Sequence, residues 1–113
     1  MSNRTPELLI EDILDSAIKI QRYTAGLTFE QFLSDDKTVD AVIRNFEIIG
    51  EASSRLPEDY RAANSNIDWA RIRGFRNRIV HGYFGVDHTI VWNIIENFLP
   101  KLIQSISAST DKG

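Results

Sequence analysis

The chain has 113 residues, of which 42% are hydrophobic and 26% are charged, and its formal net charge is −3. This length suits one domain with a single core, and the composition is typical of folded globular proteins rather than disordered ones. The absence of cysteine excludes disulfides and thiolate-bound zinc, and the acidic balance differs from that of proteins that coat nucleic acid along their length.

The sequence also lacks the signals of membrane insertion and export. No segment approaches the roughly 20 consecutive apolar residues that a membrane-spanning helix requires. Near the N-terminus the acidic Glu7 precedes any apolar run, which is not the pattern of a signal peptide. We therefore expect a cytoplasmic protein that has no association with membranes.

The first predicted helix covers residues 6–25. Thr5 is a typical N-cap, and Pro6 occupies the first helical position, where its missing N–H has no intrahelical partner to lose. Apolar residues then recur at helical spacing as far as Tyr23, and Gly26 provides a C-terminal stop.

Two further helical segments follow in the first half of the chain. Thr28 and Gln31 have the spacing of a capping box and predict a short helical turn. A long helix is then predicted over residues 37–55, with Asp35 or Asp36 as its N-cap. Its apolar positions recur every three or four residues: Val39, Val42, Ile43, Phe46, Ile49 and Ala52.

A connection over residues 57–66 leads to the third main helix. Asp68 is a candidate N-cap for this helix, which we expect to run from Trp69 to Val80 or His81. Two glycines then interrupt the helical pattern and predict a loop over residues 82–86.

Asp87 is a candidate cap for the last helix, and we expect a break in this helix just before Pro100, which lacks a backbone donor. The sequence contains no strand pattern and no internal repeat. It predicts one all-α domain over residues 1–113, an antiparallel bundle of four main helices plus short helical turns. Its core covers about residues 6–106, followed by a flexible tail over residues 107–113. The nearly all-round apolar character of the last helix also predicts a dimer.

The charge pattern reverses within residues 71–84. No Asp or Glu occurs between residues 69 and 86, and the four arginines of this stretch contribute +4, so the rest of the chain carries −7. A local cationic strip on an acidic body indicates a site for an anion such as phosphate. Its cationic and titratable members are Arg71, Arg73, Arg76, Arg78 and His81.

Three residues of this stretch have useful chemistry: Arg76, Asn77 and His81. On an ideal helix Asn77 and His81 share a face, whereas Arg76 lies about 140° from His81 around the axis. Arg76 and His81 therefore converge only if the helix ends or loosens before His81, or if a second subunit completes the site. The presence of Gly82 directly after His81 favours such a helix end.

These groups suffice to cleave an RNA phosphodiester bond without a metal ion or cofactor. RNA supplies its own nucleophile, the 2′-hydroxyl, and an imidazole such as His81 titrates near neutrality and can move protons. The forked guanidinium of Arg76 suits the charge that grows on the phosphate oxygens. The products would be a 2′,3′-cyclic phosphate and a 5′-hydroxyl. Arg73 and Arg78 are candidate contacts to the RNA backbone.

A structural interpretation competes with this chemistry. Arginines on one helix often form a solvated face that pairs with carboxylates, and this chain has 16 acidic residues to offer. A single histidine near a helix C-terminus, such as His81, is frequently a capping or packing residue. Judged by spacing alone, the pattern is a weak signal of catalysis.

One segment of this stretch resembles the R-x4-H-x-Y motif of HepT-like toxins, a branch of the HEPN superfamily. Its sequence is Arg76-Asn77-Arg78-Ile79-Val80-His81-Gly82-Tyr83. The resemblance extends over nearly the whole chain, from about residue 7 to residue 104. The other segments similar to the family are residues 45–52, residues 68–75, Val91-Trp92 and Leu99-Pro100.

This resemblance implies an all-α homodimer whose two motifs face one cleft and which acts as a metal-independent endoribonuclease toxin. It implies catalytic roles for Arg76 and His81 and a supporting role for Asn77. It also implies a partner, a nucleotidyltransferase antitoxin that can transfer AMP from ATP to Tyr83 and so block RNA by bulk and charge. The alternative function is not enzymatic: the chain would be a catalytically silent helical module that binds a nucleotidyltransferase.

Overall fold

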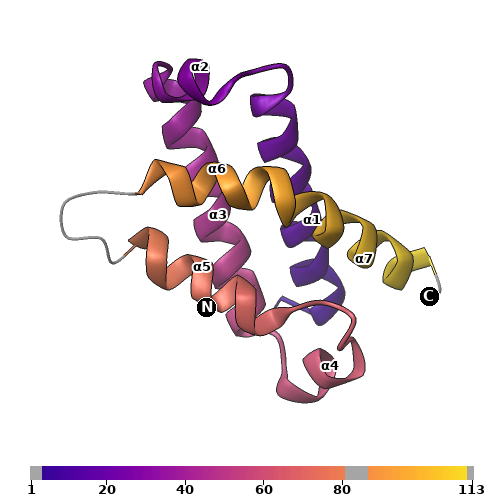
Figure 1. The fold of residues 1–113 in the computed structure, drawn as a ribbon. Helices are drawn as coiled ribbons and strands as arrows, with labels where there is room; N and C mark the ends of the chain where they lie inside the picture. The colour runs from indigo at the N-terminus through magenta and orange to yellow at the C-terminus, as the bar shows by residue number, and fades with distance from the viewer. Residues whose placement is uncertain (1–3, 81–86, 112–113) are drawn as a thin grey trace.

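The computed structural model describes residues 4–80 and 87–111, except for the side chains of residues 76–80 and 109–111. All regular structure in these ranges is helical, which confirms the predicted all-α class (Figure 1). None of the helices within them is both long enough and apolar enough to cross a membrane. The helices are α1 (Pro6–Thr24), α2 (Phe29–Leu33), α3 (Asp36–Arg55), α4 (Glu58–Ala63), α5 (Trp69–Val80), α6 (His88–Asn97) and α7 (Leu99–Asp111).

The N-terminal helices begin where their capping residues predict. The Thr5 side chain accepts a hydrogen bond from the backbone N–H of Leu8 at 3.2 Å. Thr28 and Gln31 form a complete capping box at the start of α2. Asp35, rather than Asp36, is the N-cap of α3. Each of these side chains satisfies a backbone donor that the first turn of a helix leaves without a partner.

The α3 cap also affects the ionisation of its own carboxyl group. The side chain of Asp35 accepts hydrogen bonds from the Thr38 hydroxyl at 2.7 Å and from the Thr38 backbone N–H at 3.2 Å. These two bonds, the hydroxyl first, lower the pKa of Asp35 below its usual value of 3.8. The stabilising effect of this cap is therefore present above the ordinary pKa and is lost as the pH falls through the lowered one.

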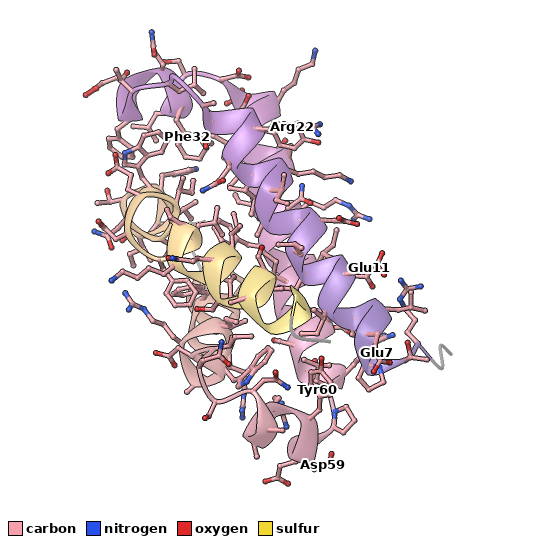
Figure 2. All side chains as sticks on the ribbon, turned by 90° about the vertical axis from the view of Figure 1, so that its right-hand side faces the viewer. Glu7, Glu11, Arg22, Phe32, Asp59 and Tyr60 are labelled. Carbon is pink, nitrogen blue, oxygen red and sulfur yellow. The ribbon has the colours of Figure 1, made fainter. Side chains whose placement is uncertain are left out.

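The centre of the molecule is the pair α1 and α3, which run side by side in opposite directions (Figure 1). Their facing apolar stripes are almost completely buried, whereas Glu7 and Glu11 project from the outer side of α1 (Figure 2). Burial of such stripes supplies most of the favourable free energy of a helical bundle. The most deeply buried members are Ile13, Ala17, Ile20, Val42 and Ile49.

The predicted last helix is divided into α6 and α7, as the position of Pro100 indicated. α6 ends at Asn97, and Pro100 lies in the first turn of α7, where no backbone donor is needed. α7 extends to Asp111, which is further than the predicted core boundary at residue 106. Ile106 is fully buried and α7 packs against α1, and the helix continues for five residues past Ile106.

α5 lies across α3 and is attached to it by buried side chains. The Phe75 ring meets the ring of Phe46 in α3 edge-on, with centroids 6.4 Å apart. At the start of α5 the indole Nε1 of Trp69 donates to the carbonyl oxygens of Arg61 and Asn64, both at 3.1 Å. These contacts fix the path of α5 relative to α3 and α4. The predicted loop over residues 82–86 lies outside the described residues.

Candidate functional site

The arginine-rich motif begins within the last two turns of α5. The backbones of Arg76, Asn77 and Arg78 are helical, and α5 ends at Val80. The side chains of these three residues, and the whole of His81 and Tyr83, lie outside the described part of the chain. The predicted convergence of Arg76 with His81 therefore stays a prediction.

The helices on either side of the motif are firmly anchored. The C-terminal end of α5 and the N-terminal end of α6 lie on the same side of the molecule (Figure 1). Asp87 caps α6 by accepting from the backbone N–H groups of Thr89 at 3.0 Å and Ile90 at 3.3 Å. Since α5 packs on α3 and α6 packs on α7, the two ends of the segment that carries His81 and Tyr83 are attached to the bundle.

Two arginines of the cationic stretch have described side chains, Arg71 and Arg73. Both are exposed, and within residues 4–75 and 87–108 neither forms an ion pair with a carboxylate. The guanidinium of Arg71 lies 5.0 Å from the centroid of the Phe98 ring, a cation–π contact. Asp68, the nearest carboxylate in sequence, accepts from the backbone N–H of Arg71 at 3.0 Å and so acts as the cap of α5. For these two arginines the salt-bridged interpretation is not supported.

Arg73 faces an open hollow of about 700 Å³ between α4 and the start of α5. Arg61 also lines this hollow, and the buried Trp69 forms part of its wall. Glu58 and Asp68 line the same hollow, so its two arginines face two carboxylates, and the role of Arg73 in contacting RNA stays a prediction.

A second hollow, of about 370 Å³, lies between the start of α1 and the middle of α3. Its charged lining is balanced, with three arginines and three carboxylates, and two of the arginines are paired: Arg4 with Asp12 at 2.8 Å and Arg55 with Glu51 at 3.2 Å. This balance gives the hollow no net attraction for a polyanion. Within the described side chains, no group of three or more His, Asp or Glu residues is positioned to hold a metal ion.

A third hollow lies between α5 and α6, and sequence reasoning did not find it. It is lined by Arg71, Gly74 and Phe75 from α5 and by Ile90, Asn93 and Ile94 from α6. Asn93 belongs to a different helix from the motif, and no short sequence pattern connects it with the arginines. Only the fold, which places α6 across this hollow from α5, brings these residues together.

Comparisons with known proteins place the chain in a family. A family model described as Ribonuclease HepT-like matches residues 13–109. A probable ribonuclease HepT of Thermococcus cleftensis is 40% identical over 93 residues, which cover 82% of this chain and 84% of the relative. A protein of Methanocaldococcus jannaschii, provisionally named an RNase, is 37% identical over 106 residues, 94% of this chain and 88% of the relative.

A third relative, from Caldanaerobacter subterraneus subsp. tengcongensis, is also provisionally named an RNase. It is 34% identical over 109 residues, which cover 96% of this chain and 97% of the relative. No solved structure matches the chain significantly. The match of the family model over most of the chain agrees with the motif resemblance and with the all-helical fold. The chain belongs to the HepT-like ribonuclease family.

Proposed function

We propose that this protein is the toxin of a type II toxin–antitoxin pair and acts as a metal-independent endoribonuclease in the cytoplasm. The observation that carries the proposal is the intact R-x4-H-x-Y motif at Arg76, His81 and Tyr83, inside a chain that matches the ribonuclease family over residues 13–109. The names of the relatives support the same reaction class.

The proposed reaction needs only groups of the motif and of RNA itself. His81 accepts the proton of a ribose 2′-hydroxyl, and the resulting oxygen attacks the adjacent phosphorus. The bond from phosphorus to the 5′-oxygen breaks, and that oxygen receives a proton from an imidazolium. In a homodimer whose two motifs face one cleft, two copies of His81 supply the base and the acid. The products are a 2′,3′-cyclic phosphate and a 5′-hydroxyl.

The arginines provide the electrostatic part of this mechanism. Arg76 holds the phosphate and stabilises the extra charge that develops on its oxygens, and Asn77 orients the phosphate or the imidazole. Arg73 and Arg78 bind neighbouring phosphates of the RNA backbone. Arg73 is exposed and forms no ion pair among the described side chains, which supports this role.

The proposed regulation acts on Tyr83. A nucleotidyltransferase antitoxin transfers AMP from ATP to the Tyr83 hydroxyl: the phenol oxygen attacks the α-phosphorus, and pyrophosphate leaves. The bound AMP adds a negative charge and considerable bulk two residues from His81. Both effects oppose the approach of RNA.

The nuclease assignment is tested with total RNA and purified protein in the presence of EDTA. We expect cleavage, and we expect the product ends to be 2′,3′-cyclic phosphate and 5′-hydroxyl. A requirement for added Mg²⁺ would contradict the mechanism. If folded protein failed to cleave any RNA but bound a nucleotidyltransferase, the silent binding module would be the better description.

The regulatory assignment is tested separately, by incubating the protein with ATP and the nucleotidyltransferase encoded nearest to it. The intact mass of wild-type protein should increase by that of an AMP group, whereas the Tyr83→Phe variant should not change. The modified protein should lose RNA cleavage. Modification at a different residue, or modified protein that still cleaves RNA normally, would reject Tyr83 as the control point.

A further inference from the structure

The hollow between α5 and α6 has a volume of about 230 Å³ and two kinds of lining. Phe75 and Ile94 are buried and form apolar walls, with exposed fractions of 8% and 4%. Arg71 and Asn93 are exposed and contribute a guanidinium and a carboxamide. Apolar walls combined with a few polar groups are typical of small-molecule sites.

Gly74 lines this hollow and borders open space. A Cβ atom added at Gly74 would meet no atom of the described residues within 4 Å, so close packing against these residues does not require glycine there. Its backbone does not adopt positive φ, so conformation does not require glycine either. A glycine inside a helix destabilises it relative to alanine. The consequence that can be seen in the structure is space at the mouth of the hollow, between Arg71 and Phe75.

One polar residue of the hollow, Arg71, packs against an aromatic ring. The Arg71 guanidinium lies 5.0 Å from the centroid of the Phe98 ring, and that ring meets the Phe75 ring edge-on at 4.9 Å. Arg71 is therefore positioned against the same aromatic cluster that forms the wall. A guanidinium supported in this way is well placed for a directional hydrogen bond at the edge of a planar ligand.

Charge favours a nucleic acid over a second copy of the chain as the occupant. α5 contains no Asp or Glu, and Arg71 has no ion-pair partner among the described side chains. A contact between two copies centred on this hollow would obey two-fold symmetry and bring two Arg71 guanidiniums toward each other. A polyanion that carries planar bases meets no such repulsion.

We propose that this hollow is a base subsite of the ribonuclease, which receives a purine next to the cleaved phosphodiester. The proposal rests on the proposed function. Six residues separate Gly74 from Val80, about 9 Å along a helix axis, so the hollow lies within a short distance of the motif. Arginine and asparagine are the side chains that pair best with the N7 edges of guanine and adenine, respectively. Arg71 and Asn93 are thus specificity-determining residues that read the edge of the purine.

The test uses three variants. Gly74→Leu fills the hollow, and Asn93→Ala removes its carboxamide. Asn97→Ala is the matched control, because Asn97 is an exposed asparagine one turn further along α6 and does not line the hollow. Circular dichroism and unfolding curves confirm that all three are folded. Cleavage sites are mapped on a randomised RNA pool, and binding is measured with 2′-deoxy oligonucleotides that differ only in one purine or pyrimidine.

Wild-type protein and Asn97→Ala should prefer a purine by about tenfold in cleavage and binding, the discrimination expected of one good base contact. Gly74→Leu and Asn93→Ala should lose most of this preference. If all four proteins cleaved RNA with the same base preference, the assignment of the subsite would be rejected and the assignment of the nuclease would stand. Purine-dependent binding that the two variants lose, without any cleavage, would support the subsite and reject the nuclease.

Two further outcomes would also overturn the proposal. If wild-type protein neither cleaved RNA nor bound the oligonucleotides, the subsite and the nuclease would both be rejected. If Gly74→Leu weakened self-association in analytical ultracentrifugation without changing base preference, the hollow would be a contact between two copies of the chain.

Discussion

The α1–α3 pair and α5 use their charged residues in opposite ways. On α1 and α3 the charges lie outside a deeply buried apolar stripe, and two of the arginines at this pair, Arg4 and Arg55, are in ion pairs. α5 begins at an acidic cap, Asp68, but its own charged residues are all basic, and its two described arginines have no ion-pair partner among the described side chains. The first arrangement favours stability, and the second keeps positive charge available to a ligand. Segments that disregard the local rules of stability are the expected places for function.

The largest effect that this comparison predicts is in the core of α1. Ile13→Ala should lower the free energy of unfolding by about 2–5 kcal/mol, because it leaves a cavity at a position with 0% exposure. Ile18→Ala is the control on the same helix, since Ile18 is 40% exposed, and it should change stability by no more than about 0.5 kcal/mol. Urea denaturation measures both. Equal effects at the two positions would contradict the placement of the core.

A smaller loss of stability is expected at the start of α6. Asp87→Ala removes the acceptor for the N–H groups of Thr89 and Ile90 and should cost about 1 kcal/mol. Asp87→Asn retains an acceptor oxygen and should stay close to wild type. Thermal unfolding of the two variants distinguishes them. If Asp87→Asn lost as much stability as Asp87→Ala, the charge of Asp87, rather than its capping hydrogen bond, would be the stabilising feature.

The aromatic contact between α5 and the C-terminal helices should be measurable as a coupling energy. A double-mutant cycle with Phe75→Leu and Phe98→Leu should give about 0.5–1.5 kcal/mol, as expected for rings that meet edge-on at 4.9 Å. Phe46→Leu serves as a reference, because its ring lies further from Phe75, at 6.4 Å. A coupling of zero between Phe75 and Phe98 would show that α5 is not attached through this pair.

The smallest predicted effect has the opposite sign. Gly74→Ala should stabilise the protein by up to about 1 kcal/mol, because alanine favours helices more than glycine does and the added methyl group meets open space. Chemical denaturation provides the measurement. A loss of stability would mean that Gly74 is needed for packing within the chain, and the contrast between α5 and the α1–α3 pair would weaken.

Most of the fold was predictable because its signals are local in sequence. Caps such as Thr5 and Asp87 act on backbone groups two or three residues away, and Pro100 determines where the last helix divides. The extension of α7 to Asp111 was not predicted, since the residues after Ile106 are small and polar and carry no apolar pattern.

The candidate site was predictable only in part. Charge pattern singled out Arg71 and Arg73, but the cation–π contact of Arg71 with Phe98 joins residues from distant parts of the sequence. The role of Asn93 in lining the third hollow likewise arises from the fold, which places α6 across the hollow from α5. The pairing of Arg76 with His81 stays a prediction, because it depends on the path of the backbone where α5 ends.

In the proposed mechanism, Arg76 and His81 perform chemistry and do not hold the fold together. The most direct test measures RNA cleavage in EDTA and the free energy of unfolding on the same preparations of wild type, Arg76→Ala and His81→Ala. We predict that each variant loses at least about a hundredfold in cleavage rate, as expected when a proton-transfer or charge-stabilising group is removed, while its stability stays within about 0.5 kcal/mol of wild type. Variants that cleave as fast as wild type, or that lose activity only in proportion to unfolding, would contradict the account.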